Sequence, residues 1–85
     1  MLWTVYVLHC SDGDLYTGCT GDLDDRMDRH RTGQVPATAT RRPFELVWYC
    51  CFQDKYAAYR FEKYLKSGSG RAFLWKRILE RTKGE

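Results

Sequence analysis

Two β-rich runs near the N-terminus, WTVYVLHC (3–10) and DLYTGC (14–19), are separated only by Ser11-Asp12-Gly13. β-branched and aromatic residues on both sides of a short turn that contains glycine predict an antiparallel hairpin. This hairpin constrains the fold of the chain more than any other feature of the sequence.

The turn decides which faces of the hairpin carry Tyr6 and Tyr16. A two-residue turn centred on Asp12-Gly13 pairs residue 11 with residue 14 and places the tyrosines on opposite faces. A three-residue loop with Gly13 in the left-handed conformation pairs residue 10 with 14, 8 with 16 and 6 with 18. We expect this second arrangement, which places both tyrosines on one face. Taken alone, such a pair is typical of aromatic residues that pack in a sheet.

The residues after the hairpin predict a helix and then a loop. Residues 22–31 have a helical pattern, with Asp22 or Thr20 as the N-cap and Gly33 as the stop signal. The following stretch, TGQVPATATRRP (32–43), is expected to be a loop because it is rich in turn-forming residues.

The second half of the chain predicts one strand and two helices. FELVWYCCF (44–52) is apolar enough to predict a strand that is buried on both faces. A helix is expected from an N-cap at Asp54 to Lys66, and another after an N-cap at Ser69. The inner side of this last helix is expected to carry Phe73, Leu74, Ile78 and Leu79. The order β-β-α-β-α-α predicts an α/β fold, a small and mostly antiparallel three-stranded sheet flanked by helices.

The length and the apolar residues bound the class of protein. A chain of 85 residues fits one domain, which we assign to residues 1–85. No apolar run approaches the roughly 20 residues that cross a bilayer, and the N-terminus lacks the charged region of a signal peptide. We therefore expect a cytoplasmic protein that makes no contact with a membrane.

The four cysteines do not have the spacing of a zinc site. Cys50 and Cys51 are adjacent and point to opposite faces of one strand, and no Cys-x-x-Cys pair is present. We expect Cys10, Cys19, Cys50 and Cys51 to be reduced and mostly buried, and dispensable for the chemistry.

Charge is distributed unevenly along the chain. Residues 1–28 contain six aspartates and one arginine, whereas residues 60–83 contain eight basic and two acidic residues. A basic C-terminal third suits a polyanion such as nucleic acid, although a solvated helical surface has the same composition.

Three polar residues border the apolar stripes of the predicted helices. Arg26 and His30 share one edge of the stripe on the first helix, and most of the aspartates lie elsewhere on its surface. Glu62 borders the stripe of the next helix, between Lys55 and Lys66. Taken alone, Glu62 is typical of a salt-bridged surface residue.

These residues together resemble a known family. TVY (4–6) and YTG (16–18) are similar to the two halves of the GIY-YIG signature. Arg26, His30 and Glu62 then fall where that family has its other active-site residues. The resemblance is greatest to the small stand-alone bacterial GIY-YIG proteins and extends from Trp3 to about Leu79. It is carried by the segments DGDLYTG, DLDDR, RRP and FEKYLK.

The resemblance implies a nuclease that cuts phosphodiester bonds with one divalent metal ion. It implies that Tyr6 or Tyr16 helps to activate the attacking water, that Arg26 holds the scissile phosphate and that His30 assists proton transfer. Glu62 would bind Mg²⁺ or Mn²⁺. A free tyrosine has a pKa of about 10, so it needs nearby positive charge to act as a base. We expect Arg26 and the metal ion to lower the pKa of this tyrosine.

The sequence departs from the family pattern in three ways. Thr4, Val5 and Thr17 replace the other residues of the signature, at positions that we interpret as structural. The late asparagine of many family members has no counterpart, because the chain contains no asparagine. We expect no second domain that could recognise a target site.

The expected function is therefore that of a metal-dependent endonuclease acting on DNA. The alternative is a non-catalytic nucleic-acid-binding or adaptor module on the same fold, and a protein partner could direct either one to its target. The residues expected to contact nucleic acid are basic, namely Arg41, Arg42, Lys63, Lys66, Arg71 and Lys76.

Overall fold

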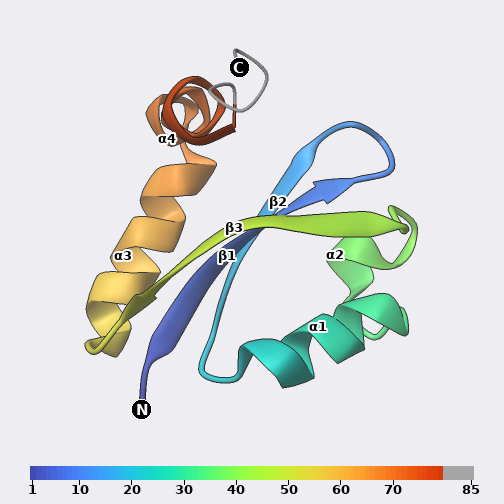
Figure 1. The fold of residues 1–85 in the computed structure, drawn as a ribbon, viewed down its shortest axis with the longest axis horizontal. Helices are drawn as coiled ribbons and strands as arrows, with labels where there is room; N and C mark the ends of the chain where they lie inside the picture. Colours follow the sequence, from blue (N-terminus) through green and yellow to red (C-terminus); the bar gives the residue numbers. More distant parts are fainter. Residues whose placement is uncertain (80–85) are drawn as a thin grey trace.

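The computed structural model describes residues 1–79, and its centre is an antiparallel three-stranded sheet. The strands are β1 (Trp3–Cys10), β2 (Leu15–Thr20) and β3 (Phe44–Phe52), and their spatial order is β2-β1-β3. Figure 1 shows β1 running between the other two strands. The predicted α/β fold, with its order of strands and helices, is confirmed.

The hairpin closes through the predicted three-residue loop. Gly13 has a φ of 84°, and the Cys10 amide donates a hydrogen bond of 2.9 Å to the Asp14 carbonyl. Tyr6 is consequently paired with Gly18. Residue 16 lies opposite residue 8, so both signature tyrosines occupy one face of the sheet, as predicted.

Three helices begin at side chains that accept hydrogen bonds from their first turns. Asp22 caps α1 (Leu23–Arg31), as predicted, and Asp54 caps α3 (Lys55–Lys66). The third helix, α4 (Gly68–Phe73), is capped by Ser67, so the predicted cap at Ser69 is wrong. The Ser67 hydroxyl also donates to the Tyr64 carbonyl at 2.6 Å, and one residue therefore ends α3 and begins α4. The chain then continues into a π-helical turn, η1 (Leu74–Leu79).

A short helix, α2 (Pro36–Ala39), interrupts the segment that the sequence predicts as a loop. Its first residue is a proline, whose fixed φ suits the first position of a helix. The Thr38 amide then donates to the Val35 carbonyl at 3.1 Å. Four residues give no helical periodicity, which explains why the sequence pattern does not reveal this element.

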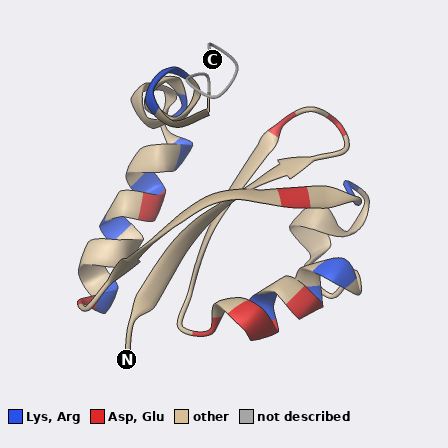
Figure 2. Cartoon of the chain, viewed as in Figure 1, with Lys and Arg blue, Asp and Glu red and all other residues tan. Residues whose placement is uncertain are grey.

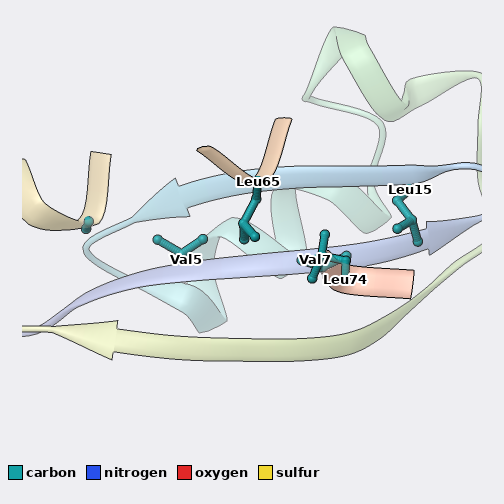
Figure 3. Close-up of a cluster of buried hydrophobic side chains, with 6 residues drawn as sticks. Val5, Val7, Leu15, Leu65 and Leu74 are labelled. Atoms are coloured by element: carbon teal, nitrogen blue, oxygen red, sulfur yellow. The ribbon is translucent and has the colours of Figure 1, made fainter. Parts of the chain in front are cut away.

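The central strand β1 is buried on both faces, and each face packs against different helices. The side facing α3 and α4 contains Val5, Val7, Leu15, Ala58, Leu65 and Leu74. Figure 3 shows this cluster between the strands and the helices. The opposite side, facing α1, has a smaller cluster of Tyr6, Leu8, Cys10 and Met27. Figure 1 accordingly shows α1 and α2 on one side of the sheet and α3 and α4 on the other.

The prediction that the third strand is buried on both faces is wrong. β3 is an edge strand, and Leu46 and Tyr49 are exposed on it. The sequence of β3 is as apolar as that of a central strand because several of its residues pack against the larger cluster, on the side of the sheet that faces α3 and α4. The fully buried position belongs to β1, since β1 pairs with both neighbours.

The cysteines are free thiols but are less buried than predicted. Cys10 is buried, Cys19 and Cys50 are half-buried, and Cys51 is exposed. Within residues 1–79 no group of three His, Cys, Asp or Glu side chains could hold a metal ion. No helix within this range is long and apolar enough to cross a membrane.

Gly70 allows α4 to turn closely against the end of α3. A Cβ atom at this position would lie 1.9 Å from the Tyr64 carbonyl oxygen and 2.5 Å from the Leu65 Cα. We expect Gly70→Ala to lower the free energy of unfolding by about 1–3 kcal/mol or more, because backbone must shift to accommodate the methyl group. Urea denaturation followed by circular dichroism measures this change.

Gly68→Ala is the matched control, because it adds the same methyl group to the same helix. A Cβ at Gly68 meets nothing within 4 Å. This variant should be at least as stable as the wild type, since alanine favours a helix more than glycine does. Equal stability of the two variants would contradict the close approach at Gly70.

Candidate active site

A chain of side-chain hydrogen bonds runs from the centre of the sheet to α2. Tyr6, on β1, is fully buried, and its hydroxyl lies 2.8 Å from Nε2 of His30 on α1. Nδ1 of His30 lies 2.7 Å from Oγ1 of Thr38. His30 and Thr38 are also fully buried, so these three polar groups have satisfied hydrogen bonds within the protein rather than with solvent.

The absence of a side chain at Gly18 makes room for the Tyr6 ring. A Cβ atom at Gly18 would lie 2.3 Å from the Tyr6 hydroxyl oxygen, which is closer than atoms can approach. The ring of Tyr6 therefore crosses over the backbone of β2, and its hydroxyl lies above this edge strand. Glycine is required at this position for steric reasons rather than for a special backbone conformation.

Tyr16 lies beside Tyr6 and His30 on the same face of the sheet. The ring centroids of Tyr6 and Tyr16 are 6.4 Å apart, and those of Tyr16 and His30 are 5.4 Å apart. Phe44 contacts His30 from β3, with centroids 5.7 Å apart. Tyr16 is half-buried, so it lies between the buried hydrogen-bond chain and solvent.

Arg26 and Glu62 lie on helices on opposite sides of the sheet, and both affect the pKa of Tyr6. Arg26, on α1, lowers the pKa of the Tyr6 hydroxyl by hydrogen bonding and by its charge. The charge of Glu62, on α3, raises the pKa of Tyr6. Burial raises the pKa of Cys19, and here too Glu62 raises it while Arg26 lowers it. Because Cys19 belongs to β2, the guanidinium and the carboxylate both act at this edge of the sheet.

The ionisation of Tyr6 differs from the sequence-based expectation. Burial, and after it the neighbouring Tyr16, raises the pKa of Tyr6 to about 12, and the positive charge of Arg26 does not overcome these effects. Arg26 lowers this pKa in the expected direction, and the combined effect of Arg26 and a bound metal ion stays a prediction. Burial and the charge of Arg26 lower the pKa of His30, so its ring is neutral at physiological pH and one of its nitrogens can accept a proton.

Glu62 is suited to a cation that keeps most of its water ligands. Its side chain is 21% exposed and forms an ion pair of 3.0 Å with Lys66. No cluster of further carboxylates, histidines or cysteines accompanies it in the described part of the chain. Mg²⁺ and Mn²⁺ accept oxygen ligands, and Mg²⁺ is commonly held by one or two carboxylates together with water and substrate phosphate. A single carboxylate at the edge of the site fits that coordination.

Several of the basic residues expected to bind nucleic acid already have hydrogen-bond or ion-pair partners within the protein. Arg41 pairs with Asp12 at 2.7 Å, and Arg71 pairs with Asp14. Arg42 donates to the carbonyls of Ala39 and Arg31, both at 2.9 Å.

The remaining basic residues lie, like Arg71, on the side of the sheet that α3 and α4 cover. Figure 2 shows that α3 and the helical turns after it are predominantly basic, whereas acidic and basic residues are mixed on α1. Lys66 pairs with Glu62, and Lys63, Lys76 and Arg77 are exposed. Arg81 and Lys83, which also belong to the basic third, lie outside the described residues.

Thr38 is the one residue of the hydrogen-bond chain that the sequence does not reveal. It lies in a stretch that contains several threonines and that the sequence pattern predicts as a loop. The only signal is Pro36, which can begin a short helix, and this signal does not distinguish Thr38 from Thr40.

Comparisons with known proteins identify the family of the chain. The model of the GIY-YIG catalytic domain family matches residues 2–77. A UPF0213 protein of Bacillus pumilus is 42% identical over 66 residues, which are 72% of this chain and 67% of that protein. A UPF0213 protein of Streptococcus agalactiae is 41% identical over 71 residues, 82% of this chain and 81% of that protein.

A solved structure has the same fold. The solution NMR structure of a UPF0213 protein from Bacillus halodurans is 36% identical to this chain, with a TM-score of 0.58. The alignment covers 98% of this chain and 96% of that protein. The family match and these relatives show that the chain belongs to the GIY-YIG catalytic domain family, a nuclease superfamily.

Proposed function

We propose that this protein is a metal-dependent endonuclease that hydrolyses phosphodiester bonds in DNA. The observation that carries the proposal is the hydrogen bond between Tyr6 and neutral His30, at a site influenced by both Arg26 and Glu62. A site for binding alone does not need a buried acid–base pair beside a carboxylate. Membership of the nuclease superfamily supports the same reaction class.

The pair Tyr6–His30 can activate water without forming a free tyrosinate. As the water oxygen attacks phosphorus, its proton passes to the Tyr6 oxygen, and the Tyr6 proton passes to Nε2 of His30. The P–O bond to the leaving oxygen breaks, and this oxygen takes a proton from solvent. Because the two transfers are coupled, the high pKa of Tyr6 does not prevent the reaction. Tyr16, whose ring lies beside those of Tyr6 and His30, would contact the same water or an adjacent phosphate oxygen.

Arg26 and a metal ion bound by Glu62 would stabilise the negative charge on the phosphate. The planar guanidinium of Arg26 can donate two parallel hydrogen bonds to non-bridging phosphate oxygens. Glu62 would hold Mg²⁺ or Mn²⁺, which would supply Lewis-acid stabilisation of the charge that develops in the transition state. Lys66 would release its ion pair with Glu62 when the cation binds.

A nicking assay tests the function directly. Supercoiled plasmid, single-stranded oligonucleotides and branched duplexes are incubated with the full chain in Mg²⁺, in Mn²⁺ and in EDTA. We expect cleavage that needs the divalent ion. Tight DNA binding without cleavage under all of these conditions would contradict the endonuclease and favour the non-catalytic binding module.

Affinity for DNA should decrease steeply with salt, because the exposed basic residues after β3 would contact phosphates. Each phosphate that the protein neutralises contributes about −0.9 to the slope of log affinity against log salt for duplex DNA. We therefore expect the double variant Lys63→Gln/Lys76→Gln to reduce this slope by about 0.9 for each phosphate that it no longer neutralises. Fluorescence anisotropy of labelled DNA at several salt concentrations measures the slope.

A charge-matched control separates this surface from general electrostatics. Arg29→Gln/Arg31→Gln removes the same net charge from the exposed surface of α1, where both arginines pair with aspartates. Its slope should stay close to that of the wild type. An equal decrease in both double variants would show that binding does not depend on the basic surface after β3.

A further inference from the structure

Thr38 forms a buried hydrogen bond with the ring of His30. Oγ1 of Thr38 lies 2.7 Å from Nδ1 of His30, and this contact occupies the ring nitrogen that does not face Tyr6. The same hydroxyl lies 3.4 Å from the Val35 carbonyl oxygen, in position to donate to it. A neutral histidine carries one N–H, so the role of Thr38 as donor or acceptor fixes which nitrogen remains unprotonated.

The group at the Thr38 end of the hydrogen-bond chain defines its direction. The Val35 carbonyl can only accept, so the single proton of the Thr38 hydroxyl is donated to it. Every group of the chain is then satisfied when Tyr6 donates to Nε2 and Nδ1–H donates to Thr38. In the opposite direction Thr38 would not donate to Val35, and the Tyr6 proton would need a different acceptor.

The backbone around Thr38 is held firmly in place. Its amide donates to the Val35 carbonyl at 3.1 Å, and its carbonyl accepts from the Arg41 amide at 2.9 Å. Arg42 joins α2 to the end of α1 through the carbonyls of Ala39 and Arg31. Thr38 is fully buried as well, so solvent does not compete for its hydroxyl. Arg42, expected from the sequence to bind nucleic acid, thus has a role in placing Thr38 against His30.

We propose that Thr38 is a positioning residue that holds His30 in the Nδ1–H tautomer, with the Nε2 lone pair directed at the Tyr6 hydroxyl. In this tautomer His30 can accept the Tyr6 proton, whereas in the Nε2–H tautomer it cannot. After the transfer, Nδ1–H of the imidazolium still donates to Thr38, so no rearrangement is needed. The catalytic consequence of this inference rests on the endonuclease function proposed above.

The tautomer can be measured without any cleavage assay. The chain contains two histidines, so long-range ¹H–¹⁵N correlation spectra of uniformly labelled protein contain two sets of imidazole signals. Spectra are recorded at about pH 8, where an ordinary histidine is neutral. His9 is exposed and contacts Trp75 rather than Thr38, so it serves as the internal reference.

Two substitutions distinguish the effect of the Thr38 hydroxyl from the effect of the volume of its side chain. Thr38→Val keeps the shape and removes the hydroxyl, whereas Thr38→Ser keeps the hydroxyl and removes a methyl group. We expect His30 of the wild type and of Thr38→Ser to be in the Nδ1–H form, and Thr38→Val to gain the Nε2–H form. In the nicking assay Thr38→Val should lower kcat by about 10²-fold with little change in KM, the usual range for impaired acid–base catalysis. Thr38→Ser should retain most of the activity, although the missing methyl group lowers its stability.

Two results would overturn the inference. One is a wild-type His30 in the Nε2–H form, which needs no variant to be observed. The other is a Thr38→Val protein whose His30 stays in the Nδ1–H form. If the wild type cleaves no DNA, the proposed function fails, while the tautomer spectra on the same samples still decide the role of Thr38.

Discussion

Replacing Glu62 by glutamine is expected to abolish metal-dependent cleavage while the protein remains folded. Glutamine keeps the shape of the side chain but removes the charge that would hold the divalent ion. A Lewis acid contributes several kcal/mol to the stabilisation of the transition state, so we expect a loss of about 10³-fold or more. Stability should change little, because Glu62 pairs with the half-exposed side chain of Lys66.

Glu45→Gln is the matched control for this prediction. Glu45 is an exposed carboxylate on β3, and it should be replaceable without loss of cleavage. Mn²⁺ binding measured by titration calorimetry in the presence of a DNA oligonucleotide should be lost in Glu62→Gln and retained in Glu45→Gln. Near-normal cleavage by a folded Glu62→Gln protein would require a different metal site.

Removing the hydroxyl of Tyr6 should have an effect of similar size. We expect Tyr6→Phe to lower kcat by about 10²–10⁴-fold, because the proton path from water to His30 is interrupted. The change also leaves Nε2 of buried His30 without its partner, which costs about 1–3 kcal/mol of stability. The assay is therefore run at a temperature where circular dichroism shows the variant to be folded.

Tyr49→Phe controls for the loss of a phenolic hydroxyl on the sheet. Tyr49 pairs with Tyr6 across β1 and β3, but its side chain is exposed. This variant should cleave as the wild type does. Tyr16→Phe in the same experiment shows which signature tyrosine activates the water, and full activity of Tyr6→Phe would exclude Tyr6 from that role.

The local features of the fold could be predicted because they depend on neighbouring residues. Gly13 and the turn length fix the register of the hairpin, and this register alone places Tyr6 and Tyr16 on one face. The capping aspartates likewise mark the starts of α1 and α3. These features are determined within a few residues of the chain, so pattern and spacing suffice to identify them.

The features that the sequence does not predict depend on packing between distant segments. β3 is apolar, yet its edge position follows from the pairing of β1 with both neighbours, which its own sequence does not encode. Thr38 contacts His30 only because α2 folds back on α1. The raised pKa of Tyr6 follows from the depth at which β1 is buried, so it could not be estimated from charges in the sequence.

The unequal clusters on the two faces of the sheet have a consequence for how the proposed nuclease would lose activity on warming. Arg26 and His30 belong to the helix that packs over the smaller cluster, whereas Glu62 belongs to the one that packs over the larger. Elements with less buried apolar contact detach at a lower free energy than the rest of a protein. Detachment of α1 would separate Arg26 and His30 from Tyr6 while the hairpin and α3 stay folded. This local opening would then limit the temperature range of the proposed activity. Enlarging the cluster beneath α3 would raise Tm without extending that range.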